Sequence, residues 1–212
     1  MLDKMELIKK TEDLRISDLS SFPSLSLYMD QVLEILSQNS IFLAKEEKLT
    51  SAMVNNYIKE GLLPRAKGKK YSKQHVALLT IISRLKQVLS VKEISSLMVL
   101  FGKEEIPQEK REDLYDNIYL KFENILNKET DAVQKKLNQA DDINFLILDL
   151  AISSYVQKIV CELVLKNALL AKEEEKKIEE EEKEKEKERE KKKEKEKEKQ
   201  EKKEEKAKKK KE

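Results

Sequence analysis

Apolar residues in this chain recur at the three-and-four spacing of an α-helix, and Gly and Pro occur only between the segments that show this spacing. These residues are Gly61, Gly68, Gly102, Pro23, Pro64 and Pro107. Gly and Pro at such places end helices and form turns. No strand-like alternation of apolar and polar residues extends beyond four residues. The sequence therefore predicts an essentially all-α protein.

Apolar stripes and capping residues predict where the helices lie. We expect helices over 25–38, 50–60, from Ser72 to about Leu89, from Ser90 to Phe101, over about 108–127 and over 143–170. Thr50 or Ser51 can cap the second helix, and Gly61 can end it. Ser90 and Glu93 have the spacing of a capping box, in which each side chain binds a free backbone N–H of the other residue.

The last 41 residues, 172–212, follow different rules from the body of the chain. They comprise 20 Lys or Arg, 18 Glu and three other residues, so they cannot bury a core. We expect a solvated tail that is either a fluctuating helix continuing from 143–170 or a disordered segment. The body is neutral overall, with 24 basic and 24 acidic residues, so any basic patch on it must be local.

Few residues could carry catalysis or bind metal. With one His and one Cys, the chain has neither an internal disulfide nor a Cys/His zinc site. His75 lacks a nucleophilic partner at a recognisable spacing, so we expect a surface or capping residue, and we expect Cys161 in a core. Asp141 and Asp142 are expected to cap a helix. We predict no catalytic residues, no metal site and no cofactor, and hence no enzyme.

The sequence also indicates a cytoplasmic protein. Its first residues are charged at every few positions and lack the apolar stretch of a signal peptide. The apolar segment 143–170 is interrupted by Asp149, Lys158, Glu162 and Lys166. Because a span needs about 20 predominantly apolar residues, we predict a buried helix and no membrane partner.

Charged and polar residues are concentrated between residues 51 and 73. If helix 50–60 turns its apolar residues inward, Ser51, Asn55 and Lys59 lie on its outer face at four-residue spacing, with Asn56 beside them. A basic turn follows, and the cations of this region are Lys59, Arg65, Lys67, Lys69, Lys70 and Lys73. One acid, Glu60, opposes them. This is the footprint of a recognition helix beside a phosphate-contacting wing, although a solvated basic loop would have the same charges.

The same region resembles the DNA-binding domain of MerR-type regulators. The resemblance rests on Val54-Asn55-Asn56-Tyr57-Ile58-Lys59-Glu60-Gly61-Leu62-Leu63-Pro64, on Gly68-Lys69-Lys70-Tyr71-Ser72, and on Leu85-Lys86 with Ser90-Val91-Lys92-Glu93-Ile94. With Tyr28-Met29-Asp30-Gln31 upstream, residues 23–100 are similar to the bacterial family catalogued as domain of unknown function 1836, a MerR-like winged helix-turn-helix. MerR proteins usually carry a basic residue at the position of Asn55 and an aromatic one at Asn56, so no base preference is carried over.

The resemblance implies a division of the chain and a function. The expected parts are an N-terminal segment 1–22, a MerR-like winged helix-turn-helix domain 23–104, a helical C-terminal region 105–171 and the charged tail 172–212. The expected function is a DNA-binding transcriptional regulator that reads double-stranded DNA with helix 50–60 and grips it with wing 64–71. The expected DNA-binding residues are Ser51, Asn55, Asn56, Lys59, Arg65, Lys67, Lys69, Lys70, Tyr71 and Lys73.

Two further expectations concern partners. Region 107–170 would form a homodimer, because a nearly all-round apolar helix exposes too much hydrocarbon if one short helix, 108–127, covers it. The competing expectation is that 107–170 folds back on 72–100 as one monomeric bundle. No effector is indicated by the sequence. The alternative function is a helical protein-interaction scaffold without sequence-specific DNA binding.

Overall fold

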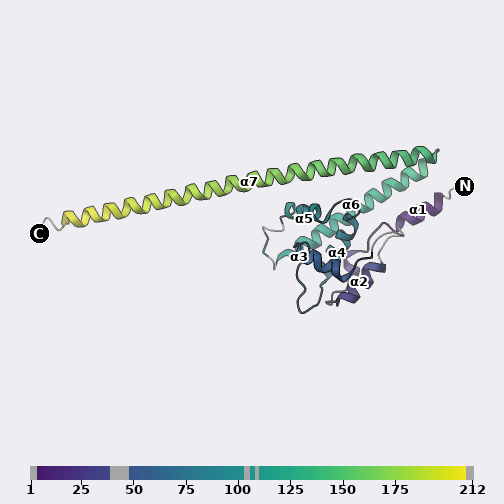
Figure 1. Cartoon of the computed structure of the whole chain (residues 1–212), viewed down its shortest axis with the longest axis horizontal. Coiled ribbons are helices and arrows are strands. Elements are labelled where there is room, and N and C mark those ends of the chain that lie inside the picture. Colours follow the sequence, from purple (N-terminus) through teal and green to yellow (C-terminus); the bar gives the residue numbers. More distant parts are fainter. Residues whose placement is uncertain (1–3, 39–47, 103–105, 108–109, 209–212) are drawn as a thin grey trace. The chain divides into compact units, whose positions relative to one another are not determined.

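The computed structural model describes residues 4–38, 48–102, 106–107 and 110–208. Within these ranges the chain forms seven α-helices, one 3-10 helix and two isolated antiparallel bridges, with no longer strand (Figure 1). The elements are α1 (Lys4–Glu12), η1 (Leu19–Ser21), α2 (Met29–Gln38), α3 (Ser51–Lys59), α4 (Lys73–Leu85), α5 (Val91–Leu100), α6 (Arg111–Gln139) and α7 (Ile143–Lys208). The prediction of an all-α protein is confirmed.

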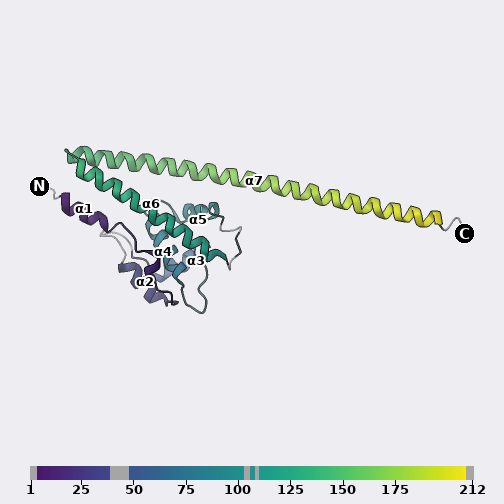
Figure 2. The ribbon, with the colours of Figure 1, turned by 180° about the vertical axis from the view of Figure 1, so that it is seen from behind.

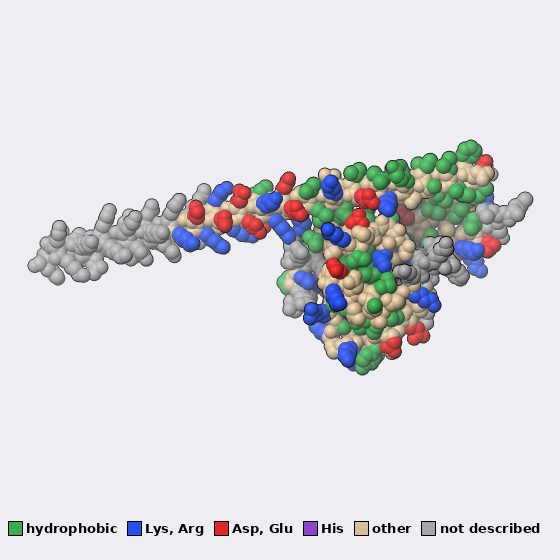
Figure 3. All heavy atoms as spheres, in the orientation of Figure 1, with side chains coloured by type: hydrophobic (Ala, Val, Ile, Leu, Met, Phe, Trp, Pro, Cys, Tyr) green, Lys and Arg blue, Asp and Glu red, His purple; other side chains and the backbone are tan. Residues whose placement is uncertain are grey.

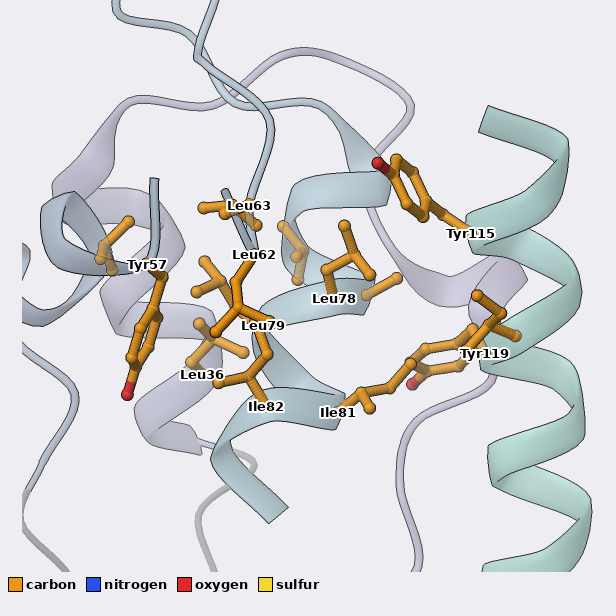
Figure 4. Close-up of a cluster of buried hydrophobic side chains, with 14 of the residues drawn as sticks. Leu36, Tyr57, Leu62, Leu63, Leu78, Leu79, Ile81, Ile82, Tyr115 and Tyr119 are labelled. Atoms are coloured by element: carbon orange, nitrogen blue, oxygen red, sulfur yellow. The ribbon is translucent and has the colours of Figure 1, made fainter. Parts of the chain in front are cut away.

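Helix α4 is the centre of the core. Eight consecutive residues, His75–Ile82, are buried, so neighbours must cover this helix on every side. α4 packs against α2 and, over a longer stretch, against α6. In Figure 4, Tyr57 approaches α4 from α3, whereas Tyr115 and Tyr119 approach it from α6. The core therefore joins elements from both sides of the predicted boundary at 104/105, which itself lies outside the described residues.

The N-terminal segment is part of the same core. The side chains of Ile16, Leu19 and Phe22 are buried in the core cluster. The Phe22 ring packs edge-on against Tyr119, with ring centroids 5.5 Å apart, and the Tyr119 hydroxyl donates a hydrogen bond of 2.6 Å to the Ser17 carbonyl. The segment that sequence analysis set apart as 1–22 thus covers one face of α6.

Helix α6 extends past the predicted end at residue 127. Its second half packs against α1 and the residues that follow α1. Arg15 connects the two, because its guanidinium donates hydrogen bonds to Asn127 at 3.2 Å and to Asp131 at 2.5 Å. These contacts depend on chain segments more than one hundred residues apart, so no local signal in 128–139 predicted them.

The start of the predicted helix 25–38 was wrong. The observed helix begins at Met29, and Leu25, expected on its apolar face, is 78% exposed. Leu27 is instead extended and pairs with Tyr71 through two backbone hydrogen bonds of 2.8 Å each. This pairing joins Leu27 to the end of the basic segment 64–71.

Helix α7 is not buried within the single chain. Most of its apolar side chains between Ile143 and Leu165 are exposed, and Cys161, expected in a core, is exposed as well. Apolar composition shows that a helix requires a cover but not where the cover comes from, and cover by a second copy of the chain stays a prediction. The expected cap is present, since Asp142 accepts a hydrogen bond of 2.8 Å from the Asn144 N–H.

Contacts divide the chain into two units, Met1–Leu165 and Lys166–Glu212. The second unit is helical to Lys208, which is the helical one of the two alternatives that the tail composition left open. Lys183 pairs with Glu179 at 3.5 Å and Lys185 with Glu181 at 3.7 Å, both at four-residue spacing and both exposed. Such pairs each contribute only about 0.3–0.5 kcal/mol to a helix.

Candidate nucleic-acid interface

Helix α3 separates buried and exposed residues as its pattern predicts. The Thr50 hydroxyl caps its first turn by accepting a hydrogen bond of 3.3 Å from the Met53 N–H. Val54 and Tyr57 are buried in the core. Four polar residues predicted to bind DNA lie on the exposed side, namely Ser51, Asn55, Asn56 and Lys59. Their side chains are free to contact a ligand along the length of the helix.

A left-handed residue ends α3 and turns the chain back toward the core. Gly61 has a φ of 68°, which a residue with a Cβ adopts only at a cost. The Leu62 N–H donates to the Tyr57 carbonyl at 2.9 Å, and the Gly61 N–H donates to the Ile58 carbonyl at 3.1 Å. These two bonds make a Schellman motif, and Leu62 and Leu63 then enter the core. The path of the chain into the next segment is therefore fixed.

The residues 64–71, which we call the basic loop, project from the helices around them (Figures 1 and 2). At its tip Lys67 and Lys70 form an antiparallel bridge, and the Lys70 N–H donates to the Lys67 carbonyl at 3.0 Å. Gly68 and Lys69 between them have φ values of 58° and 62°. Two central residues at positive φ are typical of a two-residue type I′ hairpin turn. The basic loop is thus a short hairpin with lysines at its tip.

The base of the basic loop is held by Tyr71 and His75. Tyr71 is only 5% exposed, and burial raises the pKa of its hydroxyl. Its ring packs edge-on against His75 at 5.4 Å between centroids. The Nδ1 atom of His75 accepts a hydrogen bond of 3.0 Å from the Ser72 N–H, which completes a capping box at the start of α4. Burial lowers the pKa of His75, and the backbone of Pro64 and Arg65 offsets part of that effect.

The predicted cations differ in what they contact. Lys70 lies over the Tyr28 ring, with 5.8 Å between Nζ and the ring centroid. Lys73 pairs with Asp116 of α6 at 4.0 Å and is largely covered. By contrast, the side chains of Lys59, Arg65, Lys67 and Lys69 are exposed and make no ion pair among the residues that the structure describes. Figure 3 shows Lys and Arg side chains at several places on the drawn face of the packed body, with Asp and Glu side chains among them.

The structure leaves eight of the ten predicted residues exposed, on α3 and on the basic loop that follows it in sequence. Tyr71 and Lys73 are the exceptions, because the Tyr71 side chain is in the core and the Lys73 side chain is partly covered beside Asp116. Leu27 and Tyr28 support the loop, and neither role was predicted, because both residues lie within the predicted helix 25–38. No group of three or more His, Cys, Asp or Glu side chains within the described part of the chain could hold a metal ion.

Comparisons with known proteins give one match. The family described as Domain of unknown function (DUF1836) matches residues 17–122, which is half of the chain and contains η1, α2, α3, α4, α5 and the first part of α6. No curated protein and no solved structure matches the chain. The match covers the basic loop, the outward face of α3 and the core that supports them. The chain therefore belongs to the family described as Domain of unknown function (DUF1836).

Proposed function

We propose that this protein is a DNA-binding transcriptional regulator of the MerR-like winged helix-turn-helix type. The observation that supports it best is the combination of an exposed polar face on α3 with a projecting basic hairpin beside it in sequence. A helix of this kind fits the major groove, and cations on a projecting loop fit the adjacent phosphates. The proposal involves no catalysis and no cofactor, and it has the protein act in the cytoplasm.

The proposal gives the residues different roles. Asn55 and Asn56 would contact base edges, because an amide side chain can form two hydrogen bonds to an adenine in the major groove. Lys59, Arg65, Lys67 and Lys69 would hold phosphates, since none of them forms an ion pair among the described residues. Lys70 and Lys73 would contribute less, because Tyr28 and Asp116 already hold their side chains. Tyr71 would act as an anchor of the wing.

Salt dependence with a Lys69→Gly variant tests the proposal. Lys69 has a φ of 62°, where Gly is favoured, so this change removes a charge without straining the turn. We expect affinity for any duplex to fall and the slope of log affinity against log salt to become shallower by about 1. Fluorescence anisotropy with a labelled duplex of random sequence, between about 50 and 200 mM salt, measures both.

A matched control removes a lysine elsewhere on the body. Lys128→Ala deletes an exposed cation from α6 and should leave the slope unchanged. Equal slopes for the wild type and Lys69→Gly, with both chains folded, would remove the basic loop from the proposed interface.

The alternative function is a helical scaffold that binds a protein partner. One observation favours it, namely the exposed apolar side chains of α7. The salt series separates the two functions, because apolar protein contacts do not release counterions from a phosphate backbone. Absence of duplex binding even at about 50 mM salt would favour the scaffold.

A further inference from the structure

The first part of α7 exposes a large apolar surface. Ten large apolar side chains between residues 145 and 164 are 39% to 71% exposed, namely Phe145, Ile147, Leu148, Ile152, Tyr155, Val156, Ile159, Val160, Leu163 and Val164. Figure 3 shows hydrophobic side chains along the outer edge of this part of the helix. None of α7 belongs to the buried core cluster of the described residues. The surface is therefore left over after the chain has folded its own core.

Five of these residues form a regular seam. Phe145, Leu148, Ile152, Tyr155 and Ile159 follow one another at spacings of three, four, three and four residues. This is the spacing of the a and d positions of a coiled coil, in which two helices supercoil around each other. We call these five residues the α7 seam. A seam of this period fits another helix better than it fits a flat surface.

We propose that a second copy of this chain covers the α7 seam, with α7 packed against α7. The ten exposed side chains lie within about six turns of one helix. Apolar residues exposed on a monomer are normally scattered singly, so a continuous row of this kind marks a surface that associates. A second copy of the chain brings an identical seam of the same spacing, so the two seams can interdigitate.

Among the residues that the structure describes, none covers the seam. Sequence analysis expected the whole region 107–170 to dimerise, but Tyr115, Ile118 and Tyr119 of α6 are buried against α4 in the core of the same chain. Residues 172–212 are almost entirely Lys and Glu, so they have nothing apolar to place on the seam. This leaves α7 as the surface for self-association.

A lipid bilayer is the other candidate that could cover the α7 seam. By length and composition α7 contains a segment that could cross a membrane. An 18-residue stretch of it has a mean hydropathy of 1.4, and 6% of that stretch is buried. However, Asp149, Lys158 and Glu162 lie within 143–165, and each charge costs about 2.5–3.5 kcal/mol at the centre of a membrane helix. Asp149 also pairs with Lys136 of α6 at 2.7 Å. Asp149 and Lys158 lie beside the seam and stay in water when a second helix covers it, whereas Glu162 stands at the next position of the repeat and ends the apolar seam.

Sedimentation of the full chain at micromolar concentration tests the proposal. The wild type should sediment at twice 24.8 kDa, and Leu148→Asp should return it to 24.8 kDa, because a charge would enter the seam. Ser154→Asp adds the same charge half a turn away from the seam, on an exposed position, and should remain a dimer. Leu148 is already exposed, so circular dichroism should show both variants folded.

Two further measurements identify the occupant. A spin label on Cys161, the one cysteine of the chain, should report a defined distance to its copy in the wild type and none in Leu148→Asp. Vesicles of phosphatidylcholine and phosphatidylglycerol should not carry the protein upward in flotation. A wild type that stays at 24.8 kDa, or that floats with vesicles without self-association, would overturn the proposal. These measurements contain no DNA, so they do not depend on the proposed function.

Discussion

At the scale of single residues, His75 shows how one side chain can hold a loop. Its Nδ1 accepts from the backbone N–H of Ser72, which requires a neutral ring, and its face packs against Tyr71. The ring is 8% exposed. Sequence analysis left a surface or a capping position open, and the structure gives a buried capping residue. The pattern Ser-x-x-His lacks the Glu or Gln of a usual capping box, so the sequence signal was weak.

Acid should destabilise the protein through His75. Burial lowers its pKa in the folded state below the ordinary value of 6.5, so the unfolded chain binds the proton more readily. The contribution of His75 to stability is thus present above about pH 6.5 and is lost as the pH falls below it. Urea unfolding of the wild type between pH 8 and 5 measures this, with His75→Gln as control, because Gln can accept the same hydrogen bond without titrating. Parallel curves for the two proteins would contradict the prediction.

At the scale of elements, α6 and the N-terminal segment depend on each other. Ile16, Leu19 and Phe22 pack in the core, whereas α1 itself contains no buried residue. The residues that follow α1 therefore contribute more to packing than the helix does. Residues 23–104 alone lack both these side chains and α6, so they do not contain the whole core.

Two deletions should separate the roles of these residues. Removing 1–22 takes away three core side chains, each worth about 1.5–3 kcal/mol when buried, which together is a large part of a typical total stability of about 5–15 kcal/mol. Removing only 1–12 leaves those side chains in place and should cost much less. Urea unfolding followed by circular dichroism compares the two. Equal losses would show that α1 itself provides the stability.

At the scale of the whole molecule, the chain combines a packed unit with a helix that has no core. Within Lys166–Glu212 the described ion pairs are exposed and individually weak. In proteins most of the stability of a helix comes from its packing against other elements, and a helix without such packing is only marginally stable in water. The two units should therefore lose their structure independently.

Removing 172–212 should leave the urea midpoint of the remaining chain unchanged, because no residue of that segment whose burial is described is part of the core cluster. The difference in circular dichroism between the full and the shortened chain isolates the tail. This difference signal should fall gradually with temperature, and salt should weaken it by screening the Glu–Lys pairs. A loss of more than about 1 kcal/mol on truncation would show that the tail stabilises the body.

The sequence alone determined where chain segments turn and what their local chemistry is. Thr50, Ser72 and Ser90 begin helices, and Gly61 ends one, because a cap satisfies backbone groups within a few residues of itself. The spacing of the apolar residues in α3 also predicted which of its residues are exposed, because that spacing depends only on residues of the helix itself. These features need no knowledge of distant segments.

The tertiary structure decided what each apolar surface contacts. Leu27 pairs with Tyr71, and Tyr119 packs under Phe22, across separations that leave no trace in local spacing. The period of α6 and α7 predicted an apolar face on both, yet α6 found its cover within the chain and α7 did not. Burial depends on the sum of contacts from all elements, whereas periodicity reports one element at a time.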